Sequence, residues 1–156
     1  MGVGRPSPGD TLRALPFSGG ASHRFGGTAL RSFGMPPRLH HVQLSAPPGS
    51  EERARAFYGG ILGLQEVAKP AHLVSRGGIW LALADGQLHI GIEEGFRPSR
   101  KSHPAFEVED VDALRARLEA HGVTTVDDEP LPGWTRFYAS DPFGNRLEFL
   151  SRRAPP

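Results

Sequence analysis

The sequence contains no cysteine. A disulfide framework, a thiolate zinc site, an iron–sulfur cluster and a cysteine nucleophile are therefore excluded. It also lacks any apolar run approaching the roughly 20 residues that a membrane-spanning helix needs, so we expect a soluble, cytoplasmic protein without a membrane partner. The formal net charge is +1. Because a dedicated nucleic-acid binder carries a strong basic excess, we expect no nucleic-acid partner.

Glycine and proline are abundant, at 20 and 15 residues, and they are dense at the start of the chain. Residues 1–37 show no sustained helical or strand periodicity, and this composition is typical of a disordered tail. The charged residues of this segment are Arg5, Arg13, Arg24, Arg31 and Asp10. Two interpretations remain open: a genuine disordered tail, or a true start at Met35 with the upstream segment an artefact. With either one, we expect residues 38–151 to form a single folded domain.

The first part of this domain, residues 38 to about 93, predicts a strand, a helix and three strands. Apolar and polar residues alternate over 38–46, as in a strand with one buried face. A helix is expected to begin after Ser50 as its N-cap. The three strands that follow are expected near 65–69, at 77–84 and at 87–92. The last two are joined by Asp85-Gly86, which is typical of a two-residue hairpin turn.

The second part, residues 103–151, repeats the same plan. Asp110 is expected to cap a helix over 110–122. The strands are expected at 103–109, 123–126, 134–140 and 146–151. Within this part, DPFGN (141–145) has Pro and Gly where a type I turn favours them. The two halves together predict an α+β fold of two βαβββ modules, although their sequences share little.

Four predicted strands carry an ionisable residue opposite their apolar stripe: His41, His89, His103 and Glu148. If helices cover the apolar faces, the other faces form a polar concavity. Imidazole and carboxylate together suit one divalent metal ion, Fe, Mn, Zn, Ni or Co. The alternative stays open at this point, because a histidine on a strand is often only hydrogen-bonded and a strand glutamate is often only solvated.

The folded part resembles the vicinal oxygen chelate superfamily, which includes glyoxalase I, bleomycin-resistance proteins, fosfomycin-resistance enzymes and extradiol dioxygenases. The segments that carry the resemblance are LHHVQL (39–44), RAFYGGILGL (55–64), HPAFEVEDVDAL (103–114) and FYASDPFGNRLEFL (137–150). The most specific motif is Tyr138, Asp141-Pro142, Gly144-Asn145 and Glu148. The resemblance implies paired βαβββ modules whose curved sheets enclose a metal. The tail lies outside it.

The resemblance also implies roles for individual residues. His41, His103 and Glu148 fall at metal-ligand positions, and Tyr138 falls where related enzymes place a tyrosine that contacts substrate. His89 stands where glyoxalase I enzymes commonly carry a glutamate, which argues against lactoylglutathione lyase activity. Extradiol dioxygenases carry an acid–base histidine on the corresponding strand. His89 is therefore expected as either a fourth ligand or a proton carrier.

Further residues are candidates for binding a small-molecule, anionic substrate. Arg97 and Arg100 lie in the segment that joins the modules, and Arg136 shares a strand face with Tyr138; guanidinium groups suit a carboxylate or phosphate. Trp80 is expected to line the cavity or to belong to the core. For Arg97 and Arg100 the alternative is an ordinary solvated linker.

Two classes of function follow from these residues. The first is a metal-dependent enzyme, a lyase, isomerase or ring-cleaving dioxygenase, acting on a small oxygenated substrate. The second is a metal-free protein that sequesters a small molecule, as bleomycin-resistance proteins do. We expect a homodimer. If the modules are exchanged between chains, His41 comes from one chain, and His103 with Glu148 from the other.

Overall fold

A computed structural model describes residues 36–153 of the chain. The tail predicted at 1–37 therefore falls almost wholly outside the described residues. Within 36–153, no helix is both long enough and apolar enough to cross a membrane.

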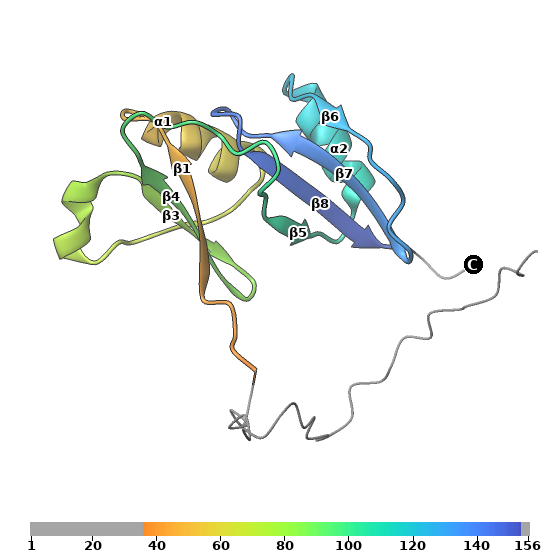
Figure 1. The fold of residues 1–156 in the computed structure, drawn as a ribbon, viewed down its shortest axis with the longest axis horizontal. Helices are drawn as coiled ribbons and strands as arrows, with labels where there is room; N and C mark the ends of the chain where they lie inside the picture. The colour runs from red at the N-terminus through yellow and green to blue at the C-terminus, as the bar shows by residue number, and fades with distance from the viewer. Residues whose placement is uncertain (1–35, 154–156) are drawn as a thin grey trace, which may run out of the picture. The chain divides into compact units, whose positions relative to one another are not determined.

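The first module forms a four-stranded sheet in the order β1-β4-β3-β2. Figure 1 labels β1, β4 and β3 of this sheet. Its elements are β1 (His41–Ala46), α1 (Glu51–Ala54), the π-helix η1 (Arg55–Ile61), β2 (Glu66–Val67), the 3₁₀ helix η2 (Ala71–Arg76), β3 (Ile79–Leu83) and β4 (Gly86–Ile92). β1 runs parallel to β4, and the other neighbours are antiparallel. The first strand of the module thus lies beside the last.

The second module repeats this topology in a sheet of order β5-β8-β7-β6. Its elements are β5 (Ala105–Glu107), α2 (Val111–Ala120), β6 (Thr125–Val126), β7 (Trp134–Ser140) and β8 (Arg146–Arg152). β5 is parallel to β8, and β7 is antiparallel to both β8 and β6. The predicted α+β fold of two βαβββ modules is confirmed.

The core lies on one face of each sheet because apolar and polar residues alternate along the strands. In β8, Leu147 and Phe149 are buried in the hydrophobic core, while Arg146 and Glu148 lie on the opposite face. α2 packs against β6, β7 and β8, as Figure 1 shows. Phe57 of η1, in the first module, belongs to the same hydrophobic core cluster as Leu147 and Phe149. The polar residues of the strands lie on the opposite face of each sheet, which no helix within the described residues covers.

The helix of the first module begins after Ser50, as predicted, but the Ser50 side chain does not cap it. The backbone of Ser50 is helical, with φ −87° and ψ −11°, and its side chain makes no capping hydrogen bond. An N-cap side chain reaches the first helical N–H groups from an extended backbone. The Ser50 hydroxyl instead donates to the carbonyl of Pro47. Asp110 has that extended conformation, and its carboxylate accepts from the N–H groups of Asp112 and Ala113, which confirms its predicted cap.

The hairpin between β3 and β4 is shifted by one residue from the prediction. Leu83 pairs with Gly86, so Ala84 and Asp85 form the turn and Gly86 begins the strand. Gly86 has φ +137°, and a β-carbon there would lie 2.7 Å from the carbonyl oxygen of His40. The glycine is therefore needed for the close approach of the chain before β1.

A buried polar network joins the two modules. The hydroxyl of Tyr58 donates to Oδ2 of Asp141 at 2.7 Å, and burial, reinforced by this carboxylate, raises the pKa of Tyr58. Asp141 also accepts from the side-chain amide of Asn145, which donates in turn to the carbonyl of Ser45 at the end of β1. The DPFGN turn thus ties β7 and β8 to the helix and first strand of the other module.

Candidate functional site

Three aromatic rings stack on the polar face of the first sheet. His89 on β4 lies between Trp80 on β3, at a centroid distance of 4.1 Å, and His41 on β1, at 4.4 Å. The ring planes are within 1° and 16° of parallel. The register explains the stack, because Trp80 and His89 are direct partners across β3 and β4. Trp80 thus lies on the same face of the sheet as His89, opposite the buried Ile79 and Leu81, and its role in lining a substrate cavity stays a prediction.

The stack determines the charge state of its central imidazole. Only 5% of His89 is exposed, and its Nε2 lies 2.9 Å from Oε1 of Gln87. Burial lowers the pKa of His89, and the neighbouring His41 lowers it further by charge repulsion. The neutral ring is therefore favoured at neutral pH, and a neutral ring is the form that binds a metal or accepts a proton.

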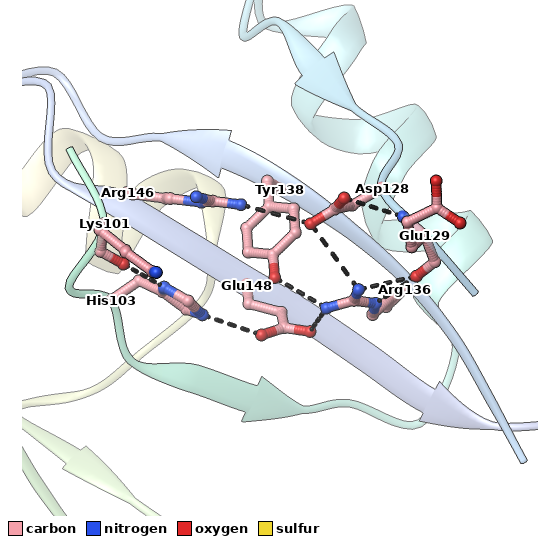
Figure 2. Close-up of polar contacts among 8 residues, drawn as sticks. All are labelled: Lys101, His103, Asp128, Glu129, Arg136, Tyr138, Arg146 and Glu148. Atoms are coloured by element: carbon pink, nitrogen blue, oxygen red, sulfur yellow. Dashed lines mark hydrogen bonds and ion pairs between the residues drawn. The ribbon is translucent and has the colours of Figure 1, made fainter. Parts of the chain in front are cut away.

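His103 and Glu148 meet on the polar face of the second sheet. Nε2 of His103 lies 3.0 Å from Oε2 of Glu148, and Nδ1 lies 2.7 Å from the carbonyl oxygen of Lys101 (Figure 2). A carbonyl oxygen can only accept, so Nδ1 carries a proton. The 3.0 Å contact is a hydrogen bond if Nε2 carries a proton as well, and Nε2 can present a lone pair towards the carboxylate only if a cation lies between them.

With a cation between them, the two side chains would act as a pair of metal ligands. Ligating histidines commonly donate the other ring N–H to a backbone carbonyl, as His103 does to Lys101. Two ligands that each lie about 2.1 Å from one metal, at right angles, are about 3.0 Å apart. The observed separation of 3.0 Å between His103 and Glu148 matches that spacing. These two residues therefore fit a divalent metal ion.

Arg136 fixes the ionisation of Glu148. Nη1 of Arg136 donates to Oε1 of Glu148 at 2.9 Å and to the hydroxyl of Tyr138 at 2.7 Å. Burial raises the pKa of Glu148, but hydrogen bonds from Arg136 and His103 outweigh it, and the pKa lies below its usual value. The carboxylate is therefore ionised, with one oxygen held by Arg136 and the other facing His103.

A second guanidinium stands beside Tyr138. The Cζ atom of Arg146 lies 3.7 Å from the centre of the Tyr138 ring, and Nη2 lies 3.6 Å from Oδ2 of Asp128. Arg136 reaches the same Asp128 oxygen at 3.7 Å. Tyr138, Arg146 and Asp128 also line a cavity of about 910 Å³ at the β6–β7 edge. Figure 2 shows Asp128 between the two guanidinium groups.

The residues predicted for one site form two groups. His41, His89 and Trp80 gather on the first sheet, and His103, Glu148, Tyr138 and Arg136 on the second. Within residues 36–153, no three His, Asp or Glu side chains are arranged to hold a metal together. Arg97 and Arg100 are exposed between β4 and β5, and neither makes a hydrogen bond or ion pair with a described residue of these two groups.

Sequence reasoning missed Arg146 and Asp128 as site residues. Arg146 had a usable signal, because it precedes Glu148 by two residues on the same strand and thus shares its face. Asp128 had none, since it lies in the irregular segment between β6 and β7, where no periodicity indicates which way a side chain points.

A family model described as the Glyoxalase/Bleomycin resistance protein/Dioxygenase superfamily matches residues 38–149. The chain belongs to this superfamily. The resemblance read from the four sequence segments is therefore confirmed. No curated protein matches the chain at a significant level.

Solved structures agree with this membership. A putative glyoxalase family protein from Bacillus anthracis is 44% identical, with a TM-score of 0.73 over 76% of this chain and 98% of that one. TnmS3, an antibiotic binding protein from Streptomyces sp. CB03234, is 26% identical, with a TM-score of 0.58 over 74% and 97%. A lactoylglutathione lyase from Agrobacterium tumefaciens is 22% identical, with a TM-score of 0.57 over 74% and 94%, and shares the fold.

Proposed function

We propose that residues 38–151 form a metal-dependent enzyme domain that acts on a small oxygenated substrate. The observation that carries the proposal is the His103–Glu148 pair. Its ring nitrogen and carboxylate oxygen are 3.0 Å apart, and the other ring nitrogen is held by Lys101. This arrangement orients both ligands before a cation arrives, and Arg136 keeps the carboxylate ionised.

A second copy of the chain would complete the ligand set. In this proposal His41, supported by His89, comes from the first sheet of one protomer, while His103 and Glu148 come from the other. The open strand edges support such an assembly, because β1 pairs only with β4, and β5 only with β8, among the described strands. Unpaired edges of this kind are ready to pair with another chain. The proposed assembly is a homodimer.

A divalent metal, when bound, would polarise two neighbouring oxygens of the substrate and stabilise negative charge that develops on them. The chain's own residues supply the remaining work. His89, kept neutral by burial, is the candidate proton acceptor or further ligand. The hydroxyl of Tyr138, oriented by Arg136, is placed to donate to a substrate oxygen. Trp80 packs His89 in position.

Metal-free sequestration of a small molecule is the second candidate function. Arg136 already places a permanent positive charge 2.9 Å from the Glu148 carboxylate, so a metal is not required to balance that buried charge. The similarity to the antibiotic binding protein TnmS3 supports the same function. In this case the cavity beside Tyr138 would hold the ligand.

Metal stoichiometry separates the two candidates. The untagged full-length chain would be analysed by elemental mass spectrometry beside His103→Gln/Glu148→Gln. A matched control, Glu109→Gln/His121→Gln, removes the same two residue types from exposed positions. We expect about one equivalent of Fe, Mn, Zn, Ni or Co per chain in the wild type and the control, and loss in the site variant. A folded wild type that binds no metal after reconstitution would favour sequestration.

A further inference from the structure

The two guanidinium groups beside Tyr138 have different amounts of unused hydrogen-bonding capacity. Arg136 donates to Glu148, to Tyr138 and twice to the carbonyl of Glu129. Arg146 donates no hydrogen bond to any residue within 36–153, and its one ion pair, to Asp128, spans 3.6 Å. The N–H donors of Arg136 are thus used within the site, whereas those of Arg146 remain available for a ligand.

We propose that Arg146 binds an oxyanionic group of the substrate, a carboxylate, phosphate or phosphonate, and that Asp128 occupies this place until the substrate arrives. The proposal rests on the proposed function, in that the ligand is the small molecule that reaches the Glu148 centre. The sequence suggested Arg97, Arg100 and Arg136 as anion contacts, whereas this proposal assigns that role to Arg146.

The Tyr138 ring prepares Arg146 for this role. With its Cζ 3.7 Å from the ring centre, the guanidinium is held over the aromatic face. A planar group fixed in this way presents two parallel N–H donors, which match the two oxygens of a carboxylate or phosphate. Less conformational entropy is lost on binding than for a free side chain.

Tyr138 connects the cavity to the rest of the site. Arg146 and Tyr138 both line the cavity of about 910 Å³, and Tyr138 also contacts Arg136, which holds Glu148. A ligand in the cavity can therefore contact both Tyr138 and Arg146.

The position of the Asp128 carboxylate indicates where the anionic group of a ligand would bind. A single oxygen of its carboxylate lies 3.6 Å from Arg146 and 3.7 Å from Arg136, so it already stands between the two cations. Both distances exceed hydrogen-bonding range, and the Asp128 side chain is 42% exposed. Such exposed pairs are weak and easily displaced. A ligand anion that replaces Asp128 keeps the local charge balanced and forms shorter contacts.

Anion titrations of the metal-free protein test the proposal. The full-length chain, treated with chelator, would be titrated with inorganic phosphate and separately with acetate at constant ionic strength, while NMR follows the arginine Nε–H and Tyr138 signals. The variants are Arg146→Gln, Arg146→Lys and Asp128→Asn. Asp127→Asn is the matched control, because Asp127 carries the same charge and lines the same cavity but is paired with Arg115 instead of Arg146.

We expect saturable binding of at least one of the two anions by the wild type, and the stronger of them identifies the ligand class. Arg146→Gln should weaken binding at least about tenfold, and Arg146→Lys should weaken it less, because the charge remains without the planar pair of donors. Asp128→Asn should tighten binding about two- to fivefold. Asp127→Asn should leave it unchanged.

Binding of neither anion, or equal binding by wild type and by Arg146→Gln with a native NMR spectrum, would overturn the proposal. Equal effects of Asp128→Asn and Asp127→Asn would overturn the role of Asp128. The absence of metal keeps this test separate from the proposed function. A protein that binds metal but no anion refutes only the inference, and one that binds an anion but never a metal refutes only the metal-dependent mechanism.

Discussion

Tyr58→Phe removes one hydroxyl from the network that joins the two modules. Tyr58 is fully buried, and its hydroxyl donates to Asp141 at 2.7 Å. Hydrogen bonds to charged groups contribute about 1.5–3 kcal/mol. The Asp141 carboxylate keeps its three other donors, the backbone N–H groups of Phe143 and Asn145 and the side-chain amide of Asn145. We therefore expect the free energy of unfolding to fall by about 2 kcal/mol.

Urea unfolding at one fixed protein concentration measures this loss. The midpoint should fall by about 1 M with an unchanged slope, because the surface exposed on unfolding stays the same. Tyr138→Phe is the matched control, since it removes the only other tyrosine hydroxyl of the chain. Its partner Arg136 keeps Glu148 and Glu129, so the cost should stay below about 1 kcal/mol. Equal costs for the two variants would refute the reasoning that this network ties the modules together.

Four further substitutions test how local interactions stabilise the fold. Asp110→Ala removes the side-chain cap of α2 and should lower the free energy of unfolding by about 1 kcal/mol in urea. Gly78→Ala should cost more than about 2 kcal/mol, since its φ is +75° and a β-carbon would collide with the carbonyl of Ile90. Gly95→Ala, at φ +67° but in open space, should cost about 1 kcal/mol, and equal costs would exclude the collision as the cause. A hydrogen bond from the backbone N–H of Gly78 lowers the pKa of Glu51, so this carboxylate stabilises the fold above about pH 4.5, its unfolded value, and the gain is lost as pH falls through the folded value. Glu51→Gln should therefore flatten the loss of stability in acid, and an unchanged acid profile would contradict this assignment.

The fold could be predicted from the sequence because strand periodicity determines which residues share a face. Leu147 and Phe149 on one side of β8, with Glu148 on the other, required only the two-residue repeat of a strand. The DPFGN segment likewise indicated its turn, which the hydrogen bond from Gly144 N–H to the Asp141 carbonyl confirms. Local patterns of this kind need no knowledge of distant parts of the chain.

The π-helix and the short 3₁₀ helix could not be predicted in the same way. The pattern around Phe57 and Tyr58 indicates a buried helical face, but it does not distinguish an α-helix from a π-helix. Residues 71–76 bury none of their side chains fully, so no apolar stripe marks the helix there. Propensity alone distinguishes such turns poorly from loops.

The candidate site was only partly predictable for a related reason. Periodicity placed His41, His89, His103 and Glu148 on polar faces, but it does not specify which of them meet. The pairing of β7 with β8 sets Tyr138 opposite Glu148, and the parallel pairing of β5 with β8 brings His103 to the same carboxylate. Strand register and side-chain rotamers thus determine which site residues come into contact, and neither can be inferred from the periodicity of the sequence.

The central claim is that His41 of one protomer and His103 of another hold one metal ion. Complementation tests it most directly: His41→Ala and His103→Ala, each expected to bind no metal alone, are co-expressed and the mixed dimer is purified. In the mixed dimer, one site loses both residues and the other keeps both. We predict about one metal equivalent per mixed dimer by elemental mass spectrometry. A mixed dimer without metal would contradict the claim, because ligand sets contained within single chains would all be damaged.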